Sequence, residues 1–224
     1  MTTSFLELPE IWRQYPIVGT SGEAAPTADR TSADEALVQR ALAGEREAFG
    51  ALYQRYHVGI YRFARAMTGS TAMAEDVMQE VFLELMRTLN RYDAARGSLG
   101  TYLYGIARNV SRYRLRRERR FVGFDQWMRR EPAVDQDPSR AIAQSQEVAR
   151  VRALIKGLSS RYREVLILCD LQDFSYEAAA AMLNVRIGTV RSRLHRARQQ
   201  LAYRLTQADR AISPVGGGAQ KCLI

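Results

Sequence analysis

The sequence is poor in the residues on which metal sites, disulfide frameworks and membrane spans depend. It contains two cysteines and two histidines in 224 residues, and Cys169 and Cys222 have no partner at metal-ligand spacing. No segment reaches the roughly 18 uninterrupted apolar residues of a membrane helix, and the N-terminus lacks the pattern of a secretory signal. We therefore expect a cytoplasmic protein without a metal, another cofactor or a membrane insertion.

The residue groupings that support catalysis are also missing. A nucleic-acid hydrolase would need clustered carboxylates for a metal, or a nucleophile beside its base. The sequence shows neither arrangement. We therefore predict no catalytic residue and no enzyme activity.

Positive charge is abundant, and arginine supplies most of it. The formal net charge is +9, and 46% of the residues are hydrophobic, which is enough for a globular core. The planar guanidinium group suits phosphate and guanine better than the ammonium group of lysine does. A folded protein with a polyanionic partner is the natural prediction.

Apolar residues recur at spacings of three and four, without sustained alternation, so the predicted fold is all-α. This periodicity fails between residues 121 and 140, where Pro132 and Pro138 accompany Asp125, Asp135 and Asp137. Such a composition is typical of a linker between two small helical domains. The predicted organisation is a partly disordered N-terminal extension (1–33), a helical domain (34–120), a flexible linker (121–140), a second helical domain (141–206) and a flexible tail (207–224).

The C-terminal domain has the pattern of a helix-turn-helix. Ser175 can cap a short alanine-rich helix, Asn184 tolerates the left-handed exit of that helix, and a cationic helix follows. On this last helix Arg191, Ser192, His195 and Arg196 fall on one side, as a DNA recognition helix requires. The alternative is an alanine-rich hairpin for protein contact with a solvated arginine face. The opposite, buried stripe is predicted to contain Ile187, Val190, Leu194, Ala197 and Leu201.

An arginine run at 111–120 follows Tyr102, Tyr104 and Asn109. Aromatic rings beside arginines can hold unstacked single-stranded bases by stacking and phosphate contact. For either tyrosine taken alone, packing in the core is slightly favoured. A separate patch of Asp76, Gln79, Glu80 and Leu83 shares one face of another helix. Acidic and amide groups beside a leucine avoid DNA and favour a protein partner.

These segments, in this order, resemble the sigma-70 family of bacterial RNA polymerase sigma factors, specifically the extracytoplasmic-function (ECF) group. The resemblance covers about residues 34–205. The motif Asp76-x-x-Gln79-Glu80-x-Phe82-Leu83 resembles the core-polymerase-binding helix. The run from Tyr102 to Asn109 resembles the promoter-melting segment, and the stretch from Ser175 to Leu194 resembles the minus-35 helix-turn-helix.

The resemblance implies a polymerase subunit that has no reaction of its own. Its partners would be promoter DNA, core RNA polymerase through the clamp coiled coil of the largest subunit and the flap region, and an anti-sigma factor. The polymerase-binding residues would be Asp76, Gln79, Glu80 and Leu83. The minus-10 residues would be Tyr102, Tyr104, Asn109, Arg112, Arg116, Arg117 and Arg120. The minus-35 residues would be Arg186, Thr189, Arg191, Ser192, His195 and Arg196.

A helix-turn-helix transcriptional regulator that is not a polymerase subunit is the main alternative. A response regulator of this kind has a similar C-terminal helix pair. It would also carry an N-terminal α/β receiver domain with acidic strand ends. The sequence shows no such pattern.

Overall fold

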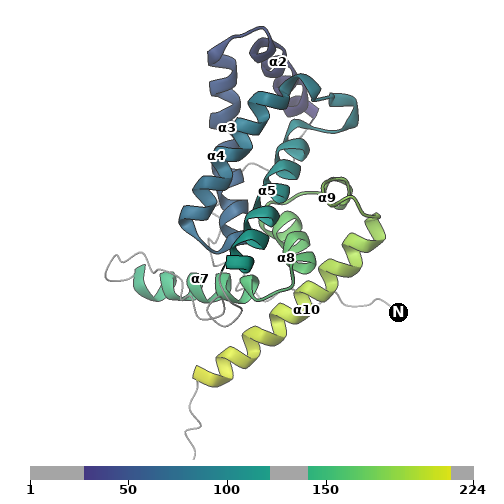
Figure 1. Ribbon diagram of the computed structural model, residues 1–224. Helices are drawn as coiled ribbons and strands as arrows, with labels where there is room; N and C mark the ends of the chain where they lie inside the picture. Colours follow the sequence, from purple (N-terminus) through teal and green to yellow (C-terminus); the bar gives the residue numbers. More distant parts are fainter. Residues whose placement is uncertain (1–27, 122–140, 213–224) are drawn as a thin grey trace, which may run out of the picture.

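The computed structural model describes residues 28–121 and 141–212, and these residues form helices joined by turns without any strand (Figure 1). The predicted all-α fold is confirmed. Most of the predicted N-terminal extension, nearly all of the predicted linker and the glycine-rich part of the tail lie outside the described residues. None of the described helices is long and apolar enough to span a membrane.

The first group of helices comprises α2 (Ala28–Leu42), α3 (Arg46–Thr68), α4 (Thr71–Thr88) and α5 (Leu99–Phe121). The 3-10 turns η1 (Leu89–Arg91) and η2 (Ala94–Arg96) connect α4 to α5. Gly69 ends α3 in the left-handed conformation at φ 74°, and the Ser70 side chain caps α4 by accepting a bond from the Met73 amide at 3.3 Å. Glycine and serine suit these two positions, so the chain reverses sharply between the helices.

Helix α2 begins earlier than its apolar pattern suggests and is attached through a buried carboxylate. The apolar pattern starts near Asp34, because residues 28–33 of the sequence carry no apolar stripe. The helix itself starts at Ala28. Asp34 is buried and accepts hydrogen bonds from Arg55 and Tyr56 of α3. Burial and the bond to Asp34 raise the pKa of Tyr56 far above its usual value. The carboxylate therefore fixes α2 against α3 while its charge remains paired.

The second group comprises α7 (Ala141–Lys156), α8 (Ser160–Leu166), α9 (Tyr176–Leu183) and α10 (Ile187–Ile212). A π-helical turn, η3 (Ile167–Leu171), continues α8. Helix α10 crosses beneath α8 in the lower part of Figure 1. Arg198 of α10 forms two hydrogen bonds to Asp170 of η3, at 2.6 and 3.0 Å. This two-point contact fixes the long helix to its own domain.

The two helix groups pack directly against each other in this structure. Helix α5 contacts α9, and α3 contacts both α7 and η3. Buried apolar residues form one continuous cluster through both groups. We call this arrangement the closed arrangement, because surfaces of both domains are covered at the junction.

Candidate nucleic-acid interface

The turn between α9 and α10 has the local geometry that its sequence predicts. The Ser175 hydroxyl accepts a hydrogen bond from the Ala178 amide at 3.1 Å, and Asn184 leaves α9 in the left-handed conformation at φ 52° and ψ 53°. Ala179 and Ala180 are buried, so their small side chains let α10 approach closely. The predicted cap and helix exit are confirmed, and they set the angle at which α10 begins.

One side of α10 is buried, although one predicted member of the stripe is not. Val190, Leu194, Ala197 and Leu201 are buried. Ile187 was predicted to join them, but its side chain is 38% exposed. It is the first residue of the helix, where neighbours lie on one side only. The stable contact of α10 with its domain therefore starts one turn later than the periodicity indicates.

The opposite side of α10 carries the predicted minus-35 residues. Thr189 is half-buried, and the other predicted residues are exposed. The Ser192 hydroxyl donates to the Thr189 carbonyl at 3.1 Å. The Arg191 guanidinium lies 5.9 Å from the centre of the Tyr176 ring, within the range of a cation–π contact. Arg186 is exposed immediately before α10, and the exposed members of this polar face of the helix are Arg191, Ser192, His195 and Arg196.

The two tyrosines predicted to meet melted DNA occupy different environments. Tyr104 is buried at the junction, where the centre of its ring lies 4.7 Å from the centre of the Phe174 ring. Its hydroxyl donates to Oε1 of Gln172 at 2.7 Å. Tyr102 is half-buried and donates to the Thr88 hydroxyl at 2.8 Å. In the closed arrangement Tyr104 therefore packs between the domains and does not face solvent.

The far part of α5 presents a solvent-facing row of polar groups. Asn109, Arg116, Arg117 and Arg120 are exposed. Tyr113 is 56% exposed, and the sequence analysis did not select it. Its position four residues after Asn109 places it on the same helical face, so the spacing could have identified it. This face combines an aromatic ring with cations, as a surface for unstacked bases does.

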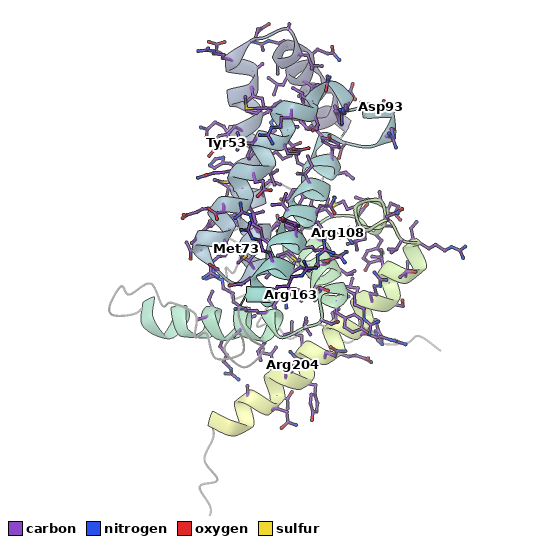
Figure 2. All side chains as sticks on the ribbon, viewed as in Figure 1. Tyr53, Met73, Asp93, Arg108, Arg163 and Arg204 are labelled. Atoms are coloured by element: carbon purple, nitrogen blue, oxygen red, sulfur yellow. The ribbon has the colours of Figure 1, made fainter. Side chains whose placement is uncertain are left out.

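A carboxylate of the second domain forms ion pairs with two further arginines of α5, Arg108 and Arg112. Oε2 of Glu164, in α8, lies 2.8 Å from Nε of Arg108, and Oε1 lies 3.6 Å from Nε of Arg112. The Glu164 side chain is only 3% exposed. Figure 2 labels Arg108 near this junction. Arg112, a predicted DNA contact, thus has an anionic neighbour from within the chain.

Next to Glu164, Arg163 connects the same two domains by hydrogen bonds to main-chain carbonyls. Its guanidinium donates to the Met67 carbonyl at the end of α3, at 2.7 Å. It also donates to the carbonyls of Lys156 and Leu158, the latter at 2.9 Å. Figure 2 shows Arg163 where α8 meets the first domain. Sequence reasoning missed both residues, since a tyrosine-arginine-glutamate stretch carries no motif.

The acidic patch of α4 remains accessible in the closed arrangement. Asp76, Gln79 and Leu83 are exposed, Leu83 by 53%, and Glu80 is half-buried. Arg114 of α5 lies 2.7 Å from carboxylate oxygens of both Asp76 and Glu80. This cation offsets part of the negative charge. The structure therefore brings the four predicted polymerase-binding residues together on one face.

Comparison with known proteins supports the order of these segments. Residues 52–121 match the family model described as Sigma-70 region 2, and residues 149–201 match Sigma-70, region 4. The chain is 35% identical over 148 residues to the ECF RNA polymerase sigma factor SigE of Mycolicibacterium smegmatis. That alignment covers 63% of this chain and 55% of SigE, so the chain spans little more than half of that relative.

Other relatives are matched over most of their length. The ECF sigma factor SigM of Mycobacterium tuberculosis is 32% identical over 190 residues, which are 84% of this chain and 89% of SigM. A solved structure of the sigma factor RpoE, in complex with the anti-sigma factor NepR from Bartonella quintana, has a TM-score of 0.59 and 26% identity. The match covers 70% of this chain and 96% of that one. The chain belongs to the ECF group of the sigma-70 family of RNA polymerase sigma factors.

Proposed function

We propose that this chain binds core RNA polymerase and directs promoter-specific initiation of transcription. The observation that carries the proposal is the polar face of α10, which is exposed while the opposite stripe fixes the helix to its domain. A helix held in this way can present Arg191, Ser192, His195 and Arg196 to the major groove of the minus-35 element. Arg186 and Thr189 would contact the DNA at the start of the helix.

The first domain, residues 34–120, would capture the melted minus-10 strand with α5. Asn109, Arg116, Arg117 and Arg120 are already exposed for this role. Tyr104 and Arg112 would join them after the domains separate, and Tyr102 would contribute from its half-buried position beside Thr88 of the same domain. The segment 121–140 would connect this domain to the minus-35 reader at 141–206.

The α4 patch would bind the polymerase. An exposed leucine surrounded by acidic and amide groups fits the clamp coiled coil of the largest subunit. The second domain would contact the flap region while it reads the minus-35 element. In this proposal the chain catalyses no reaction itself and acts in the cytoplasm with the polymerase.

An anti-sigma factor would control the factor by favouring the closed arrangement. The RpoE relative was solved with an anti-sigma factor, and its fold matches this chain. In the closed arrangement the junction already covers Tyr104 and pairs Arg112 with Glu164. A partner that binds this arrangement better than the open one would suppress DNA capture.

Transcription with purified core polymerase tests the proposal directly. We expect template-selective transcripts that depend on this chain, and their absence with a competent core enzyme would refute the sigma function. A regulator that is not a polymerase subunit would bind duplex DNA but would not confer initiation on the core. The same assay therefore separates the two functions.

Arg196→Ala tests the assignment of the minus-35 face. If Arg196 pairs with guanine, the variant should lose about 1–3 kcal/mol at one promoter position. Equal weakening across all sequences would indicate a phosphate contact instead. Arg46→Ala is a matched control, because Arg46 is exposed at the start of α3, far from α10 in the sequence.

Glu80→Gln tests the polymerase-binding patch. We expect weaker binding to core polymerase in a pull-down, since the variant removes a negative charge from the face that carries Leu83. Glu47→Gln provides the control, because Glu47 is exposed in the first turn of α3, on a different helix from the patch. If core polymerase retains Glu80→Gln in the pull-down as well as it retains the control variant, the assignment of the patch is contradicted.

A further inference from the structure

A small cavity of about 70 Å³ lies at the junction of the two domains. Helix α3 lines one side, and α7 lines another. The end of η3 and the residue after it complete the wall. Its polar and charged lining residues are Tyr61, Arg62, Arg65, Arg152 and Gln172.

The cavity has a strong excess of positive charge. Three of its lining residues are arginines, and none is acidic. Among the described residues, no carboxylate forms an ion pair with Arg62, Arg65 or Arg152. Desolvation and the charge of Arg65 lower the pKa of Arg152. The closed arrangement therefore brings like charges from α3 and α7 together, and their repulsion opposes closure.

We propose that this cavity binds one phosphate group, supplied by free phosphate or by a small phosphomonoester. A cavity needs roughly 10–15 Å³ to hold one water molecule, so about 70 Å³ has room for about five water-sized groups. A phosphate group has five heavy atoms. Guanidinium groups are the side chains best suited to bind its oxygens, and Tyr61 and Gln172 add neutral donors.

Binding of this anion would favour the closed arrangement. Arg62 and Arg65 belong to the first domain, and Arg152 belongs to the second. The complete ligand set exists only when the two domains are in contact. By linkage, an anion that needs both sides stabilises the state in which they meet. The inference goes beyond the proposed sigma function and does not depend on it.

Titration of the purified full-length chain with inorganic phosphate tests the site, by calorimetry and by thermal unfolding in buffers matched for ionic strength with chloride. We expect saturable binding with a rise in Tm. The variant Arg152→Gln should bind at least tenfold more weakly. Without phosphate, however, this variant should be at least as compact in solution scattering as the wild type, because the repulsion is relieved.

Arg46→Gln is the matched control, since it removes one exposed charge from the same helix as Arg62 and Arg65. It should keep the full phosphate response. A second titration with glycerol 3-phosphate distinguishes the two possible ligands. Tighter binding of the ester indicates a small phosphomonoester as the natural ligand. Tighter binding of inorganic phosphate indicates the free anion. Either result supports the site.

Two results would overturn the inference. The first is a wild-type response no larger than that to chloride. The second is an undiminished response in Arg152→Gln.

Discussion

The ion pair between Glu164 and Arg108 provides the sharpest test of the closed arrangement. Glu164→Gln keeps the shape of the side chain but removes its charge. The side chains are 3% and 15% exposed in the closed arrangement, whereas both would be hydrated after the domains separate. The substitution should therefore destabilise the closed arrangement selectively.

The expected magnitude follows from this burial. Removing one partner of a buried ion pair typically costs about 3–5 kcal/mol, and a hydrogen bond to a charged group contributes about 1.5–3 kcal/mol. The range of about 1.5–3 kcal/mol applies to Glu164→Gln. The glutamine still offers a hydrogen-bond acceptor to Arg108, and its burial lacks the desolvation cost of a carboxylate. A loss of about 2 kcal/mol would shift the closed-to-open equilibrium about 30-fold, since 1.4 kcal/mol corresponds to a factor of ten.

Two measurements on the full chain detect this shift. Solution scattering should show a larger radius of gyration for Glu164→Gln than for the wild type. Binding of a single-stranded oligonucleotide should strengthen, because Arg108 and Arg112 lose their anionic neighbour. Glu177→Gln is the control: it removes an exposed carboxylate from the same domain, whereas the ion pairs of Arg108 and Arg112 are with Glu164, so it should change neither quantity.

The reasoning fails if Glu164→Gln unfolds with the wild-type Tm, keeps the wild-type radius of gyration and binds the oligonucleotide no more tightly. Glu164 would then not contribute to closure. A lower Tm accompanied by an unchanged radius would locate the effect within the second domain. That result would also contradict a role at the junction.

Three further substitutions probe separate parts of the fold. Gly105→Ala should raise the free energy of unfolding in urea by about 1 kcal/mol, since an added Cβ meets no atom within 4 Å in the middle of α5; a loss of stability would contradict this. Arg163→Ala should lower that free energy by about 3 kcal/mol, because it leaves buried carbonyls without a donor, whereas an unchanged denaturation midpoint would refute a structural role. Burial and the adjacent Asp170 raise the pKa of the Cys169 thiol to about 11. In Cys222→Ser, where Cys169 is the remaining cysteine of the sequence, this thiol should therefore react with a disulfide reagent at least tenfold more slowly than a free thiol at pH 8. Its rate should increase as the pH rises. A rate matching that of a free thiol would show that burial does not protect it.

The features that the sequence predicts correctly are those determined by neighbouring residues. Ser175 caps α9 because its hydroxyl reaches an amide only three residues away. Asn184 takes the left-handed conformation of a helix exit. The buried side of α10 follows from periodicity alone, except at Ile187, where the helix end provides too few neighbours. Such features do not require knowledge of the rest of the chain.

The features that escape prediction depend on residues far apart in the sequence. Glu164 meets Arg108 across 56 positions, and Tyr104 meets Gln172 across 68. Nothing local distinguishes Glu164 from a solvated glutamate. The pattern around Tyr104 taken alone slightly favours a core residue, but it does not indicate which part of the chain covers the ring. Only the packing of one domain on the other determines that Tyr104 is covered in the closed arrangement.

The distribution of these contacts implies an order of events in the proposed function. Asp76, Gln79 and Leu83 are exposed while the domains are closed, so polymerase could bind α4 without prior opening. A ligand shifts a conformational equilibrium only by its difference in affinity for the two states. Docking on α4 alone would therefore leave the junction unchanged. DNA differs, because it would replace Glu164 as the anionic partner of Arg112. Melted promoter DNA, and not the first contact with polymerase, should therefore drive the opening.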